Sequence, residues 1–150
     1  MDREERKLKI TRTFNTAWAA LLMAVGTATA RSAEGWVVLP TASPNIIFSV
    51  DLHSVRRDGP RVKFWERLTY VRPEHTDAAS GKWIKEKKVH RVMDCERHSQ
   101  GFIYGALYAE DGAFIESTAL DQSRLQMAPI PPGTLAEKEL ELVCGASDGK

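Results

Sequence analysis

The chain has 150 residues and a formal net charge of +1 at pH 7, enough for one domain with a modest core. Residues 31–150 carry 16 Lys and Arg against 17 Asp and Glu, so their charge does not favour a nucleic acid or an anionic membrane as partner. The four histidines lack H-x-x-x-H spacing, and neither a G-x-S-x-G nucleophile motif nor a Gly-rich phosphate loop occurs. We therefore expect a protein that is not an enzyme and has no catalytic residues, cofactor or metal.

The first thirty residues have the pattern of a secretory signal peptide. Residues 1–16 are polar and basic, residues 17–26 are apolar and uncharged, and Ala28 and Ala30 suit a cleavage site. The alternative is a retained membrane anchor, but this apolar run is shorter than the roughly 20 residues of a spanning helix. We expect cleavage after Ala30, so that residues 1–30 are the signal peptide and residues 31–150 the mature domain.

The expected location follows from this signal and from the cysteines. No cysteine lies near the cleavage site, so the lipid of a bacterial lipoprotein has no acceptor there. No later stretch is apolar enough to span a bilayer. We expect an exported protein in the periplasm or the medium, neither lipid-anchored nor stably inserted in a membrane after cleavage.

The rest of the chain alternates between β-rich segments and turns. Six strands are expected, at Trp36–Leu39, Ile46–Leu52, Arg61–Val71, Trp83–Cys95, Phe102–Tyr108 and Ala113–Thr118, with a short edge strand within Leu125–Ile130. Asp58-Gly59 and Asp111-Gly112 predict hairpin turns, because Gly adopts a positive φ without steric cost. Residues 72–81 are expected to form a long exposed loop. The nearly continuous apolar run 102–108 suggests a central strand covered on both faces.

A candidate protein-binding surface lies on the strands. In the segment 61–71, Val62 and Phe64 alternate with Lys63, Trp65 and Arg67, which places the last three on one face. Because Trp and Arg are enriched in binding hot spots, we expect a protein-binding surface that comprises Lys63, Trp65, Arg67, Trp83 and Arg91. The alternatives are solvated strand faces for the cations and strand packing for Trp83.

The C-terminal segment predicts one helix. Thr134 and Glu137 fit a capping box that follows Pro131 and Pro132. One helical face is expected to carry Ala136, Leu140, Val143 and Cys144. Gly145 is a plausible end of the helix.

The chain has two cysteines, Cys95 and Cys144. Two cysteines in an exported protein usually form a disulfide bond, and here the bond would join the strand 89–95 to the C-terminal helix. The alternative is a metal or catalytic thiol, since His98 lies three residues after Cys95. No second ligand pair with zinc-like spacing occurs, so we expect the disulfide.

Several short motifs, in order, resemble the bacterial surface-adhesin protein E family. In chain order these motifs are F-S-V-D from Phe48, a D-G turn from Asp58, V-K-F-W from Val62 and M-D-C-E-R from Met93. They continue with Y-G-A-L-Y from Tyr104, E-D-G from Glu110, I-P-P-G-T from Ile130 and V-C from Val143. The resemblance implies an α+β fold: an antiparallel meander of about six strands, one C-terminal helix and a disulfide. It also implies binding to host matrix proteins and plasminogen at the bacterial surface, and the fold is known as a dimer.

We therefore expect an exported, non-enzymatic binding protein whose ligand is another protein, either of the host matrix or of the cell envelope. A homodimer is possible. A protein related to the family inhibits lysozyme, so the alternative is a periplasmic inhibitor of a lysozyme-type enzyme, with the loop 69–83 entering the enzyme's cleft. The family's named adhesin is a lipoprotein, and this chain departs from it by lacking the acceptor cysteine.

Overall fold

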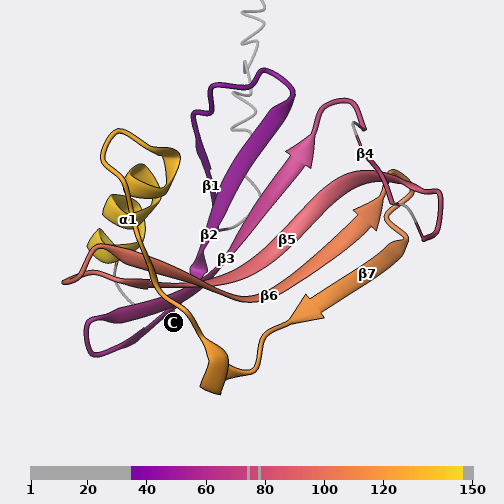
Figure 1. Ribbon diagram of the computed structural model, residues 1–150. Helices are drawn as coiled ribbons and strands as arrows, with labels where there is room; N and C mark the ends of the chain where they lie inside the picture. Colours follow the sequence, from indigo (N-terminus) through magenta and orange to yellow (C-terminus); the bar gives the residue numbers. More distant parts are fainter. Residues whose placement is uncertain (1–34, 74, 78, 147–150) are drawn as a thin grey trace, which may run out of the picture. The chain divides into compact units, whose positions relative to one another are not determined.

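A computed structural model describes residues 35–73, 75–77 and 79–146; the expected signal peptide and its cleavage site lie outside these residues. The domain is one antiparallel sheet with one helix (Figure 1). The main path of the sheet runs β1 (Trp36–Leu39), β2 (Ile46–Asp58), β3 (Arg61–Tyr70), β5 (Trp83–Asp94), β6 (Ser99–Ala109) and β7 (Phe114–Ala119). The expected α+β class, with a six-strand meander and a C-terminal helix, is confirmed.

The remaining elements are short. β4 (His75–Thr76) pairs with the start of β5, and β8 (Ala128–Pro129) pairs with β6. A 3-10 turn, η1 (Gln122–Arg124), precedes β8, and the helix α1 (Leu135–Gly145) closes the fold. The stretch 72–81 is therefore not a wholly irregular loop, because β4 holds part of it against the sheet. The two D-G turns are confirmed, with Gly59 at φ 57° and Gly112 at φ 78°.

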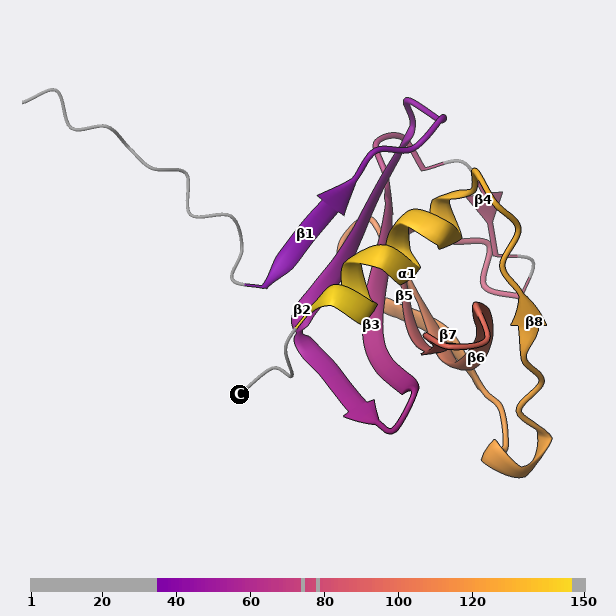
Figure 2. The same cartoon turned by 90° about the vertical axis from the view of Figure 1, so that its left-hand side faces the viewer.

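The helix covers one face of the sheet, where the core lies (Figure 2). Leu140 and Val143 of α1 pack there against side chains of β2, β3 and β5, namely Phe48, Val50, Val55, Val62, Phe64 and Met93. We call this side the helix-covered face and the opposite side the open face. In β3 the alternation is as expected: Val62 and Phe64 belong to the core, whereas Lys63, Trp65 and Arg67 belong to the open face.

Both ends of α1 are held by side chains. The Thr134 hydroxyl accepts a hydrogen bond from the Glu137 amide at 3.3 Å, and the Glu137 carboxylate accepts one from the Gly133 amide at 2.6 Å. The expected Thr134 cap is confirmed, but the Glu137 carboxylate bonds the amide of Gly133 and not that of Thr134, as a capping box would have it. At the other end, the Arg57 guanidinium donates to the carbonyls of Cys144 and Ala146 at 3.1 and 3.2 Å. A cation at this position satisfies free carbonyls and complements the helix dipole.

The disulfide between Cys95 and Cys144 is confirmed. Cys95 follows the last residue of β5, and Cys144 lies in the last turn of α1. Both are partly buried and pack against the core. The bond therefore joins the C-terminal end of the helix directly to the end of strand β5, where the turn to β6 begins.

Strand β6 is not covered on both faces, contrary to expectation. Most of its side chains are only half-buried, because α1 packs mainly against β1, β2 and β3. An α-helix of 11 residues is about 16 Å long, which spans roughly three strands at their spacing of about 4.8 Å. The apolar run 102–108 instead supplies aromatic side chains to the open face.

Arg91 lies beneath the helix and not with the other residues of the expected binding surface. Its guanidinium donates to both oxygens of the Glu66 carboxylate, at 2.6 and 2.7 Å, and to the Gln100 side chain at 3.0 Å. The Arg91 side chain is 24% exposed and that of Glu66 is 1% exposed. Burial by itself lowers the pKa of Arg91, but the hydrogen bonds and charge of Glu66 raise it overall. Arg91 is therefore a structural partner of Glu66.

Glu139 of α1 is buried beside this ion pair, which the sequence pattern did not predict. The residue is 2% exposed, and its Oε1 has no hydrogen-bond partner among the described residues. Burial, the negative charge of Glu66 and a hydrogen bond between the two carboxyl groups raise the pKa of Glu139 to about 10, although Arg91 acts to lower it. Glu139 is therefore protonated at neutral pH.

Replacing Glu139 by Gln should stabilise the domain at pH 7. Between the ordinary pKa of 4.5 and about pH 10, the folded protein holds a proton that the unfolded chain has released. The free energy of unfolding therefore falls as pH rises through this window. At pH 7 it is about 3 kcal/mol lower than it would be if Glu139 kept its proton in the unfolded chain as well. Urea unfolding from pH 5 to 9 should show a gain of up to about 3 kcal/mol at pH 7 and a flatter pH profile.

The matched control is Glu141→Gln, which makes the same substitution at an exposed position of the same helix. It should change stability by less than about 0.5 kcal/mol. Equal pH profiles for wild type and Glu139→Gln would contradict the assignment of a protonated Glu139.

Candidate functional site

Three rings from three strands form a cluster on the open face. The register pairs Trp65 of β3 with His90 of β5, and His90 with Tyr104 of β6. The Trp65 and His90 rings are stacked, with centroids 4.8 Å apart and planes 9° apart. Tyr104 meets Trp65 edge-on at 5.8 Å. Both ring contacts have favourable geometries, so the cluster is organised before any ligand arrives.

Cations lie beside this ring cluster. Arg67 is placed over the Trp36 ring at 4.3 Å, and its Nε donates to the Ser49 hydroxyl at 3.3 Å. Lys88 is the direct cross-strand partner of Arg67. Its ammonium lies 4.9 Å from the centre of the Tyr108 ring and 3.4 Å from the Glu86 carboxylate. Cations and rings therefore alternate across the open face.

The side chains of Trp65, Lys88, His90, Tyr104 and Tyr108 line a shallow hollow of about 480 Å³. Tyr104 and Tyr108 are four residues apart on one strand and flank Ala106, which pairs with Lys88 and is 1% exposed. The small Ala106 side chain leaves space between the two tyrosines.

Electrostatics keep the centre of the cluster neutral. Burial lowers the pKa of His90, and the positive charge of Lys63 lowers it further. The imidazole is therefore uncharged at pH 7 and stacks on Trp65 as a neutral ring. Positive charge on this face comes instead from the Lys and Arg side chains at its margin. The arrangement can hold a ligand by apolar contact and by charge.

The described ranges contain no group of three or more His, Cys, Asp or Glu side chains that could hold a metal ion. Within the same residues, no helix combines the length and apolar character that crossing a bilayer requires.

The structure brings together some of the residues singled out from the sequence. Lys63, Trp65 and Arg67 lie on the open face, and their binding role stays a prediction. Trp83 is 54% exposed and lines a different hollow with Lys82, Ala109, Glu110 and Asp111. The inclusion of Arg91 was wrong, because the register places it opposite Phe64 of the core.

Sequence reasoning missed Lys88, His90, Tyr104 and Tyr108. The available signal was the spacing of Tyr104 and Tyr108 in Y-G-A-L-Y, which places both rings on one side of a strand. The same alternation places Lys88 with His90. Which partners these residues meet depends on strand register.

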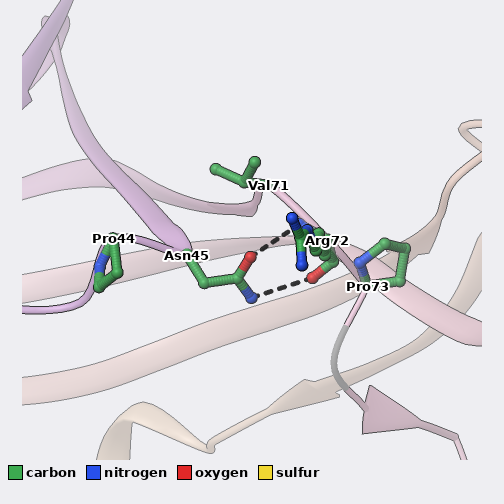
Figure 3. A pocket seen from close by; sticks show the side chains of 5 residues that line it. All are labelled: Pro44, Asn45, Val71, Arg72 and Pro73. Carbon is green, nitrogen blue, oxygen red and sulfur yellow. Dashed lines mark hydrogen bonds between the residues drawn. The ribbon is translucent and has the colours of Figure 1, made fainter.

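A second hollow, of about 600 Å³, is lined by Pro44, Asn45, Val71, Arg72 and Pro73 (Figure 3). The Asn45 side-chain oxygen accepts from the Arg72 amide at 2.8 Å, and its NH₂ group donates to the Arg72 carbonyl at 3.0 Å. The Asn45 carbonyl also accepts from the Val71 amide at 2.8 Å. These bonds tie the start of β2 to the end of β3, so Asn45 has a structural role.

Solved structures support the fold. The chain is similar to Haemophilus influenzae protein E, with 14% identity over 73% of this chain and 83% of that one, and a TM-score of 0.54. A structure of protein E from non-typeable Haemophilus influenzae has 12% identity over 73% and 75% of the two chains, with a TM-score of 0.51. At these identities the likeness shows a shared fold.

No curated protein sequence matches the chain. The model of the family described as surface-adhesin protein E matches residues 36–145. The match runs from the first strand to the last residue of α1 and so includes the sheet, the helix and both cysteines. The chain therefore belongs to the surface-adhesin protein E family.

Proposed function

We propose that this protein is an exported, non-enzymatic, adhesin-like protein that binds a protein ligand on the open face of its sheet. The observation that carries the proposal is the cluster of Trp65, His90 and Tyr104 between cationic side chains. Membership of the surface-adhesin protein E family supports the adhesin-like role.

The physical chemistry of the cluster suits protein recognition. Aromatic and Arg side chains are enriched in interfaces and supply most hot spots. Because Trp65 is already stacked on His90, little side-chain freedom remains to be lost on binding. Family resemblance makes a host matrix protein or plasminogen the ligand to test first, and a protein of the cell envelope the next.

Export is part of the same proposal. The basic, apolar and A-x-A pattern of residues 1–30 has the form of a cleavable signal. The Cys95–Cys144 disulfide is the kind of bond that persists in the periplasm and outside the cell.

Replacing Trp65 by Ala should weaken binding to the ligand by about 30-fold or more, because truncating a hot-spot residue typically costs at least about 2 kcal/mol. The assay is surface plasmon resonance with the oxidised domain over immobilised host matrix proteins and plasminogen. Trp83→Ala is the matched control, since it removes the same side chain from a site outside the cluster. Urea unfolding of each variant checks that the fold is kept.

The proposal would be contradicted if both Trp variants lost binding affinity equally, if neither lost it, or if the domain bound none of the immobilised proteins.

The second candidate function, an inhibitor of a lysozyme-type enzyme, is favoured by the exposed side chains of Val71 and Trp83 at the two ends of the 72–82 connection. If the domain inhibits lysozyme, and Trp83→Ala loses inhibition while Trp65→Ala keeps it, the inhibitor is the better description.

A further inference from the structure

Two pairs of like charges face each other across strands of the open face. Arg56 of β2 is the direct partner of Lys63 of β3, and Arg67 of β3 is the direct partner of Lys88 of β5. Direct partners lie on the same face of a sheet, and like charges placed directly opposite destabilise it. The two cross-strand repulsions therefore reduce the stability of the fold, although Arg67 gains contacts with Trp36 and Ser49, and Lys88 with Tyr108.

Nearby groups offset the repulsion only in part. The Arg56 guanidinium donates to the carbonyls of His53 and Val55 at 2.9 and 2.7 Å, which are neutral acceptors. Lys88 has the Glu86 carboxylate at 3.4 Å. Asp51 also belongs to this face as the partner of Trp65, and its Oδ1 accepts from the His53 amide at 3.0 Å. Farther along the same strands, Arg61 is paired with Asp58 and Asp94, so the four cations of the two pairs exceed the two carboxylates, Asp51 and Glu86, that lie beside them.

The ring cluster lies between the two cation pairs. Along β3 the order is Lys63, Trp65, Arg67, so Trp65 separates the pairs and its partner His90 widens the apolar centre. Residues four apart on a strand are about 13 Å apart. The face therefore presents positive charge, an apolar centre and positive charge at this spacing.

From this pattern, and on the basis of the proposed function, we infer that the protein ligand presents an extended acidic segment of five residues. Its first and fifth residues are acidic, its third residue is apolar, and its second and fourth residues can be of any type. An extended chain has the same repeat as β3, so its acidic side chains reach the two cation pairs while the apolar side chain meets Trp65 and the hollow beside it. An acidic polysaccharide matches the charges and lacks the apolar group at the centre.

The probe is the synthetic peptide acetyl-Gly-Glu-Ser-Phe-Ser-Glu-Gly-amide, titrated into the ¹⁵N-labelled oxidised domain and followed by NMR. The indole resonance of Trp65 and the amide resonances of β3 and β5 should shift. Replacing both Glu by Gln, or Phe by Ala, should weaken binding of the peptide by about tenfold or more, since both kinds of contact contribute.

The protein variants test the cations. Arg67→Gln/Lys88→Gln should weaken peptide binding by about tenfold. The substitution removes a repulsive pair but also the contacts of these cations with Trp36, Ser49, Tyr108 and Glu86, so urea unfolding of the variant checks that the fold is kept. Lys138→Gln is the control, as it removes a charge from an exposed position on α1. It should leave peptide binding unchanged.

Three outcomes would overturn the inference: no peptide binding, equal binding of the Glu and Gln peptides, or binding of a heparin fragment that exceeds peptide binding and needs no aromatic group. If the inference fails in this way while Trp65-dependent binding of a whole protein persists, the proposed function stands. If the peptide binds and no host or envelope protein does, the charge pattern stands and the proposed function fails.

Discussion

Replacing Arg91 by Met should destabilise the domain by about 3–5 kcal/mol, because it leaves the buried Glu66 carboxylate without its cation. Arg91 makes two hydrogen bonds to Glu66, and the protonated side chain of Glu139 meets this pair from α1. Met keeps much of the apolar volume of Arg, so lost packing contributes little. Urea unfolding at pH 7, followed by circular dichroism, measures the change.

The matched variant is Glu66→Met/Arg91→Met. Replacing both partners of a buried ion pair by apolar side chains is often neutral or stabilising, so this double variant should regain most of the lost stability. A loss below about 1 kcal/mol for Arg91→Met alone would mean that the pair behaves like an exposed one and that water reaches Glu66.

Removing the disulfide should cost about 4 kcal/mol through the greater freedom of the unfolded chain. Cys95 and Cys144 are 49 residues apart in sequence, so the bond closes a long loop in the unfolded state. The variant Cys95→Ala/Cys144→Ala avoids placing hydroxyl groups beside the core. A helix of 11 residues is too short to persist alone, so α1 should open first.

Hydrogen exchange gives the local readout. Amide exchange in residues 135–143 of the Ala variant should rise before exchange in the central strands β3 and β5. Wild-type protein treated with reductant should behave like the variant, which serves as the control. Equal urea midpoints for the oxidised and reduced proteins would show that packing alone holds α1 and would sink the prediction.

Much of the candidate site depends on strand register, which sequence alternation does not supply. Alternation placed Val89 and Arg91 on one face of their strand and His90 on the other. It could not say that His90 lies opposite Trp65, because hydrogen bonding between β3 and β5 sets this pairing. The expected surface therefore included Arg91 and omitted His90.

The burial of Glu139 is a second feature that the sequence pattern did not predict. The helical stripe of Ala136, Leu140 and Val143 has Glu139 at its edge, and a charged residue there is ordinarily assigned to solvent. Its burial requires a proton on Glu139 and the neighbouring Glu66–Arg91 pair. Those partners come from strands more than 40 residues earlier, so no local pattern reports them.

The sequence by itself determined the features that depend on near neighbours in the chain. Three of these features depend on local geometry, namely the D-G turns, the β alternation and the Thr134–Glu137 cap. The disulfide was predictable because two cysteines allow one pairing. Tertiary structure decided which faces meet. The short helix covers only part of the sheet, and register then places rings from three strands together and aligns the cation pairs on the uncovered side.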